Sequence, residues 1–124
     1  MKRIPAGNVE FLVETRESGA GDGDGGPSIQ VLATVEGREV QLLRFDCFRK
    51  GPHYHYDPDG RNVHYDLDPL FIEESLGWAL TQLGEKLGPL VERAGYPAVA
   101  QALDSTAVAA GLAQVAAHFR ASAP

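Results

Sequence analysis

The chain has one cysteine and no long apolar run, and each scarcity narrows the class of protein. Cys47 is the only cysteine among 124 residues, so an internal disulfide framework is excluded and a reducing compartment is favoured. No stretch approaches the roughly 20 apolar residues that cross a bilayer. Residues 1–5 are not followed by the apolar run of a secretion signal. We therefore expect a cytoplasmic protein that does not associate with membranes.

Basic residues are also scarce. Lysine and arginine number 11 against 17 aspartates and glutamates, which gives a net charge of −6. Nucleic-acid binding depends on a basic stripe that neutralises phosphates, so nucleic acid is not expected as a partner. The composition, with 44% hydrophobic and 23% charged residues, is typical of an ordinary globular protein. Its length suits one domain, which we expect to span residues 1–124.

Histidine and tyrosine are concentrated in one short segment. Three of the four histidines and three of the four tyrosines lie within residues 53–66. Residues 53–56 read His-Tyr-His-Tyr, and alternation with period two is typical of a β-strand whose two faces differ. Residues 57–60 read Asp-Pro-Asp-Gly, which is strong turn chemistry. The segment 53–66 is therefore predicted to be a β-hairpin.

A turn centred on Asp59-Gly60 determines which residues face each other across this hairpin. It places His55 opposite His64, and Tyr54 opposite Tyr65. One face of the hairpin is then expected to gather His53, His55, His64 and Asp66. The other face is expected to gather Tyr54, Tyr56, Val63, Tyr65 and Leu67.

The segments before and after the histidine run favour an α+β fold. Residues 8–16, 29–35, 40–49 and 62–67 are predicted strands joined by short turns, which indicates a four-stranded antiparallel meander. Residues 19–27 are so rich in glycine that we expect a flexible loop there. After residue 67 the apolar period changes to 3.6, so two or three C-terminal helices should pack on one face of the sheet.

The helix boundaries follow from capping and breaking residues. Asp68-Pro69 resembles a helix start, with aspartate as the N-cap and proline at the first position. Gly88-Pro89 should kink or interrupt that helix, and Gly95 should end it. The last helical segment is expected over residues 97–121, broken at Asp104-Ser105. Nothing in these patterns says which face of the hairpin the helices cover.

Three histidines on one face of a hairpin could bind a metal ion. Opposed side chains have Cβ atoms about 5 Å apart, so His53, His55 and His64 could share one ion, with Asp66 as the fourth ligand. Imidazole and carboxylate ligands suit divalent zinc, nickel, iron or copper. Asp46 or Asp57 could then accept hydrogen bonds from the distal ring nitrogens.

Other interpretations of the hairpin involve no metal ion. The hairpin could bind a small ligand or a protein partner through Tyr54, Tyr56, Tyr65 and Asp57, or the histidine face could simply be exposed to solvent. A third alternative has His55 and Asp66 as a general acid/base pair, and the sequence leaves open whether the chain is an enzyme.

Cys47 shares a face with apolar neighbours and is expected in the core. The stripes of alanine and leucine on the last helices could support a homodimer, although core packing explains them as well.

The segment Phe45-Asp46-Cys47-Phe48, followed by residues 52–58 (Pro-His-Tyr-His-Tyr-Asp-Pro), resembles a family of small uncharacterised bacterial proteins. The resemblance extends over roughly the last two-thirds of the chain. It implies a bacterial source and a compact α+β domain, and it carries no activity. The sequence thus favours a small bacterial binding or accessory protein that uses the hairpin surface. The alternative is a metalloprotein with a three-histidine site.

Overall fold

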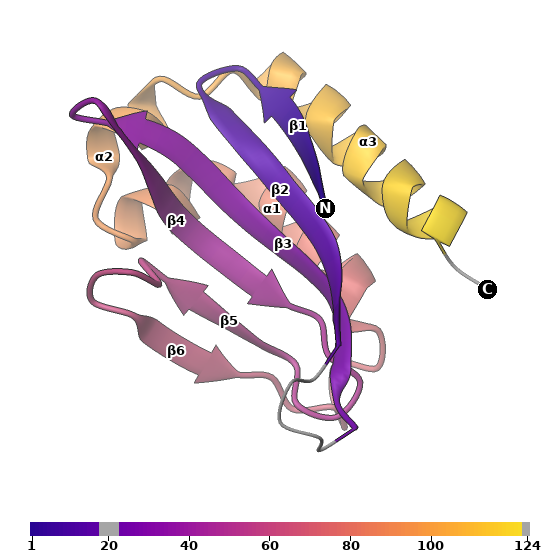
Figure 1. Cartoon of the computed structure of the whole chain (residues 1–124). Helices are drawn as coiled ribbons and strands as arrows, with labels where there is room; N and C mark the ends of the chain where they lie inside the picture. The colour runs from indigo at the N-terminus through magenta and orange to yellow at the C-terminus, as the bar shows by residue number, and fades with distance from the viewer. Residues whose placement is uncertain (18–22, 123–124) are drawn as a thin grey trace.

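The computed structural model describes residues 1–17 and 23–122 and contains one antiparallel sheet followed by helices (Figure 1). The strands form a meander in the order β1-β2-β3-β4-β5-β6, so each strand pairs with its neighbours in the chain. Their bounds are β1 Lys2–Ala6, β2 Val9–Glu17, β3 Gly25–Val35, β4 Arg38–Asp46, β5 His53–Tyr56 and β6 Val63–Asp66. The helices are α1 Ser75–Arg93, α2 Pro97–Gln101 and α3 Ser105–Ser122.

The α+β class and the meander are confirmed, but the prediction of four strands was wrong because the sheet has six. β5 is a strand of its own within the predicted hairpin. β1 was missed because it is short and contains Pro5, which usually argues against a strand. Here β1 pairs only with β2, and an edge strand tolerates a proline because one side of its backbone needs no partner.

β3 begins earlier than predicted. Gly25, Gly26 and Pro27 were expected in the glycine-rich loop of residues 19–27, yet they pair with the end of β2. Gly26 has φ 149°, and a Cβ atom there would collide with the carbonyl oxygen of Cys47, so glycine lets two backbones approach closely. The part of the predicted loop at residues 19–22 lies outside the described residues.

The first helix begins six residues later than predicted, at Ser75. Asp68 does not cap it, because its carboxylate instead accepts the N–H of Leu70 in a single isolated turn. The N-cap is Glu74, whose carboxylate accepts the N–H of Gly77. The sequence pointed to Asp68-Pro69 because a turn and a helix start share the same chemistry.

The later helix boundaries are confirmed. Pro89 lies inside α1, and the helix is interrupted at Lys86, whose φ of −145° and ψ of 36° are not helical. Gly95 follows the C-cap with φ 105°, as expected of the residue that ends a helix. The carboxylate of Asp104 accepts the N–H of Ala107 at the start of α3, where the break was predicted.

The helices cover only one face of the sheet. α3 packs against β1 and β2, and α1 packs against β4 and β5, while β6 is exposed at all four positions (Figure 1). The core between the layers contains Phe11, Val31, Leu43 and Phe45 from the sheet. Cys47 is also buried in it, as predicted. In the part of the chain that the structure describes, no helix is long and apolar enough to cross a membrane.

Candidate functional site

The hairpin has the predicted register. His53 pairs with Asp66, Tyr54 with Tyr65, and His55 with His64. Tyr54 stacks on Phe45 and contacts Trp78 of α1, so the tyrosines face the helices. The histidines therefore lie on the opposite face of the sheet, which the helices leave uncovered. We call the set His53, His55, His64, Asp66, Arg44 and Asp46 the histidine face.

The three imidazoles on this face form one cluster. Ring centroids are 5.0 Å apart for His53 and His55, and His64 lies 4.8 Å from each of them. His55 is 7% exposed as a residue, whereas His64 and Asp66 are well exposed. The predicted candidates are thus brought together, but they range from buried to fully solvated.

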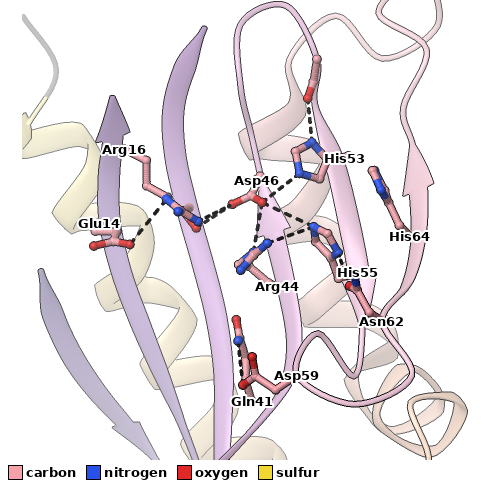
Figure 2. A network of polar contacts seen from close by, with 12 residues as sticks. Glu14, Arg16, Gln41, Arg44, Asp46, His53, His55, Asp59, Asn62 and His64 are labelled. Carbon is pink, nitrogen blue, oxygen red and sulfur yellow. Dashed lines mark hydrogen bonds and ion pairs between the residues drawn. The ribbon is translucent and has the colours of Figure 1, made fainter. Parts of the chain in front are cut away.

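Asp46 is the buried centre of a polar network that joins the four strands β2 to β5 (Figure 2). Its carboxylate is 1% exposed and accepts hydrogen bonds from Ser28 Oγ at 2.8 Å and Arg44 Nε at 3.1 Å. His53 Nε2 lies 2.9 Å from its Oδ2, and a more distant ion pair reaches Arg16. Burial opposes the charge of Asp46, but these donors outweigh it and lower its pKa to about 2.

His53 faces two acceptors and is therefore charged. Its Nε2 faces the carboxylate of Asp46, and its Nδ1 lies 2.8 Å from the carbonyl oxygen of Gly51. Carbonyl and carboxylate oxygens only accept hydrogen bonds, so both ring nitrogens must carry a proton. The hydrogen bond to Asp46 accordingly raises the pKa of His53 above 6.5.

His55 is in the opposite state. Its Nε2 lies 3.1 Å from Nη2 of Arg44, which can only donate, so this nitrogen accepts. Its Nδ1 then carries the single proton and donates to Asn62 Oδ1 at 2.7 Å. Burial lowers the pKa of His55, so its 3.7 Å approach to Asp46 is not an ion pair. Two adjacent histidines with pKa values shifted in opposite directions are typical of functional sites, although structural networks also produce them.

Two groups on the histidine face have ligand atoms close enough to share a metal ion. Asp46, His53 and His55 form one, and His53, His64 and Asp66 form the other, each with ligand atoms within 4.8 Å of one another. In the first group, Arg44 already supplies a positive charge between Asp46 and His55. Sequence reasoning considered Asp46 only as a supporting residue and did not consider Arg44. The alternation of Arg44 and Asp46 with buried Leu43 and Phe45 could have placed both on this face.

Asp57 has a structural role in the hairpin turn. Its Oδ2 accepts the N–H of Arg61, and its Oδ1 accepts the hydroxyl of Tyr96 at 2.6 Å. Asp57 thereby ties the turn to the start of α2. These two partners hold its carboxylate in the turn, so it does not support the ring nitrogens of the histidines as Asp46 does.

The tyrosine side of the hairpin lines a cavity of about 320 Å³ between β5 and α1. We call this cavity the tyrosine pocket. Sequence reasoning named Tyr54 and Tyr56 but missed the helix residues that complete the pocket, although their spacing places them on one helical face. Its lining consists of Phe45, Tyr54, Tyr56, Trp78, Gln82, Lys86, Pro89, Leu90 and Arg93.

Tyr65 lies beside the tyrosine pocket without lining it. Its ring stacks on that of Tyr54 with centroids 5.5 Å apart. The guanidinium of Arg93 lies 5.2 Å from the ring centroid of Tyr56 and 5.9 Å from that of Tyr65. Arg93 thus joins the edge strand to the helix through cation–π contacts.

Comparison with known proteins identifies a family but no activity. No curated protein and no solved structure matches the chain significantly. Residues 3–119 match a family described as a domain of unknown function, DUF7700. This finding confirms the resemblance to an uncharacterised family, without bearing on its source or on the motif. Because the match spans nearly the whole chain, the protein belongs to the DUF7700 family of domains of unknown function.

Proposed function

We propose that this protein is a small bacterial cytoplasmic binding protein that holds a small-molecule ligand in the tyrosine pocket. The observation that carries the proposal is the cavity itself, which is lined by aromatic and aliphatic side chains with a few polar groups. Its volume of about 320 Å³ lies within the range of ligand sites, roughly 300–1,000 Å³. Tyr54 and Tyr56 place it on the hairpin that the sequence singled out.

The chemistry of Cys47 and of the tyrosine pocket favours binding over catalysis. Cys47 is buried, and burial raises the pKa of its thiol to about 12, so it is protonated at neutral pH and is a poor nucleophile. The tyrosine pocket contains no histidine or carboxylate among its lining residues. It therefore offers good packing surfaces for a ligand and no evident general base.

The test is a fragment screen followed by amide NMR. Fragments that bind should shift the resonances of Trp78, Gln82 and Leu90, and the indole N–H of Trp78, the sole tryptophan, gives a separate signal. Gln82→Phe should fill part of the cavity and weaken binding at least tenfold.

The matched control is Gln114→Phe, which makes the same change on the exposed surface of α3. It should leave fragment binding unchanged. Fragments that bind elsewhere on the chain, or that bind the Gln82→Phe variant as well as the wild type, would contradict the proposal.

A second candidate function is metal binding on the histidine face. It is favoured by the two groups of ligand atoms within 4.8 Å, one of which includes the buried carboxylate of Asp46. An ion bound by Asp46, His53 and His55 would have to displace Arg44 and the second proton of His53, which argues for weak binding at neutral pH.

Elemental analysis of protein purified without a histidine tag or chelator tests this candidate. About one equivalent of zinc, nickel, iron or copper should remain after dialysis and disappear when His53, His55 and His64 are replaced together by alanine. His118→Ala, on α3, is the control. Protein that stays metal-free and gains no thermal stability from added metal would rule the candidate out.

A further inference from the structure

We propose that the ligand of the tyrosine pocket is a small planar aromatic carboxylate. This inference rests on the proposed function, because it names the class of molecule that the same pocket would hold. Three features carry it: the aromatic wall, the two cations on the helix, and the lack of any acid in the lining.

The wall of the pocket is a continuous group of rings. Phe45 and Tyr54 stack with centroids 5.4 Å apart and planes 13° apart. Trp78 approaches from α1, with its ring 6.2 Å from Phe45 and 6.0 Å from Tyr54. A planar apolar ligand can contact such rings by offset stacking or edge-to-face packing, which adds to the gain from burying its surface.

Both cations of the pocket come from α1. Lys86 and Arg93 are exposed residues in the lining, and neither forms an ion pair with a carboxylate anywhere in the described chain. The chain as a whole has 17 acidic residues and a net charge of −6. The pocket is thus a locally positive site on an acidic protein, and its charge is complementary to an anion.

The interruption of α1 occurs at one of these two cations. Pro89 lacks the backbone N–H that would continue the helical hydrogen bonding, and Lys86 has non-helical backbone angles. Gln82, Lys86, Pro89 and Arg93 nevertheless all line the same cavity. The bend therefore lies at the pocket itself, where it shapes the helix side of the cavity.

Size selects among anions. A volume of about 320 Å³ is at the small end for ligand sites, so one or two fused rings with a single carboxylate are favoured over a nucleotide. The ring is expected against Trp78 and Tyr54, with the carboxylate toward Lys86 and Arg93. A guanidinium can bind a carboxylate through two parallel hydrogen bonds, which makes Arg93 the stronger partner.

The experiment compares 2-naphthoate with 2-naphthamide, which has nearly the same shape and no charge. Affinities are measured by calorimetry, and the site is checked by the amide shifts of Trp78 and Leu90. Naphthoate should bind at least tenfold more tightly than naphthamide, and added salt should narrow the difference.

Substitutions test whether Lys86 and Arg93 cause the preference for naphthoate over naphthamide. Lys86→Gln and Arg93→Gln should each reduce the affinity for naphthoate about fivefold to tenfold and leave that for naphthamide nearly unchanged. Arg93→Lys keeps the charge and should retain most of the preference. Lys2→Gln and Arg120→Gln, outside the pocket, are the matched controls.

The outcomes separate this inference from the proposed function. Equal affinity for naphthoate and naphthamide in the pocket would overturn the carboxylate assignment and leave the proposed function standing. Naphthoate that does not bind would also overturn the assignment, and the fragment screen then decides separately whether the pocket binds any ligand. The carboxylate assignment is supported if Lys86→Gln and Arg93→Gln both lose the preference for naphthoate over naphthamide while Arg93→Lys stays close to wild type.

Discussion

At the residue scale, the three histidines of the hairpin differ in protonation state and exposure. His53 is held between two acceptors and is charged, His55 is buried beside Arg44 and is neutral, and His64 is exposed. Their different states follow from the partners of each ring rather than from the strand pattern, which treats all three alike.

The pH dependence of stability should reflect these two opposite shifts. Because the pKa of His53 is raised in the folded state, its stabilisation is fully present below pH 6.5 and is lost as the pH rises through its folded pKa. Because the pKa of His55 is lowered, the folded state loses stability as the pH falls below 6.5 toward its folded pKa. Together they predict a maximum of stability near pH 6.5.

Urea unfolding between pH 5 and 9 measures this curve, and imidazole NMR titration assigns each pKa. His53→Gln should reduce the loss of unfolding free energy above pH 6.5. His55→Gln should reduce the loss of unfolding free energy just below pH 6.5. Equal pKa values for His53 and His55 would contradict the assigned protonation states.

Asp46 is expected to be the most sensitive polar residue of the sheet. Asp46→Asn removes a buried charge and leaves Arg44 and protonated His53 without their carboxylate, so it should lower the free energy of unfolding by about 3 kcal/mol. Glu14→Gln is the control, since its contact with Arg16 is 3.9 Å long and partly exposed. That change should cost less than about 0.5 kcal/mol, as for most surface substitutions. Similar losses for both variants would show that the network around Asp46 contributes little.

At the scale of elements, turns and caps decide where each helix begins and ends. Asp68 and Glu74 both have side chains that accept a backbone N–H, but only Glu74 does so at a helix start. α1 continues past Pro89 with a bend because Leu83, Leu87 and Val91 on both sides of the bend are buried in the core. Tertiary packing therefore outweighs the local cost of the proline.

Two glycines of this region should respond in opposite directions to alanine. Gly95 has φ 105°, which disfavours any side chain, so Gly95→Ala should lower the free energy of unfolding by about 1–2 kcal/mol. Gly84 lies within α1, and a Cβ atom there would only touch Leu112 at 3.8 Å. Gly84→Ala should therefore raise stability by up to about 1 kcal/mol. Thermal and urea unfolding of the two variants measure both effects, and stabilisation by Gly95→Ala would contradict the C-terminal geometry of α1.

At the scale of the whole molecule, the sheet separates two surfaces of different chemistry. One is the helix-free face with its charged network, and the other is the tyrosine pocket at the margin of the helix layer. The same hairpin supplies both because its side chains alternate. A ligand in the pocket and an ion on the histidine face would thus be separated only by the thickness of β5.

Cys47 offers a readout of unfolding of the whole molecule. Its side chain is buried, and the pKa of its thiol is raised to about 12, so a thiol reagent should label it only after the core opens. The free energy derived from the labelling rate should match that from urea unfolding. Labelling much faster than this would indicate local opening near the end of β4.

Local patterns were sufficient for the hairpin register, the strands with alternating apolar residues and the breaks between helices. Each of these features depends on residues that are close in the chain. A turn centred on Asp59-Gly60 sets the strand pairing, Gly95 follows the end of α1, and Asp104 precedes the start of α3. β1 escaped prediction because its pairing with β2, not its composition, makes it a strand.

Only the tertiary structure decided which face of the hairpin the helices cover, because period-two alternation defines two faces without ranking them. Contact of Tyr54 with Trp78 resolves that choice, and it creates the pocket from residues of α1 that no pattern linked to the hairpin. The charges of His53 and His55 likewise depend on Asp46, Arg44 and Asn62, which the sheet and turn bring beside them. Sequence periodicity thus located the candidate site, and packing between distant segments determined the contacts and charges of its residues.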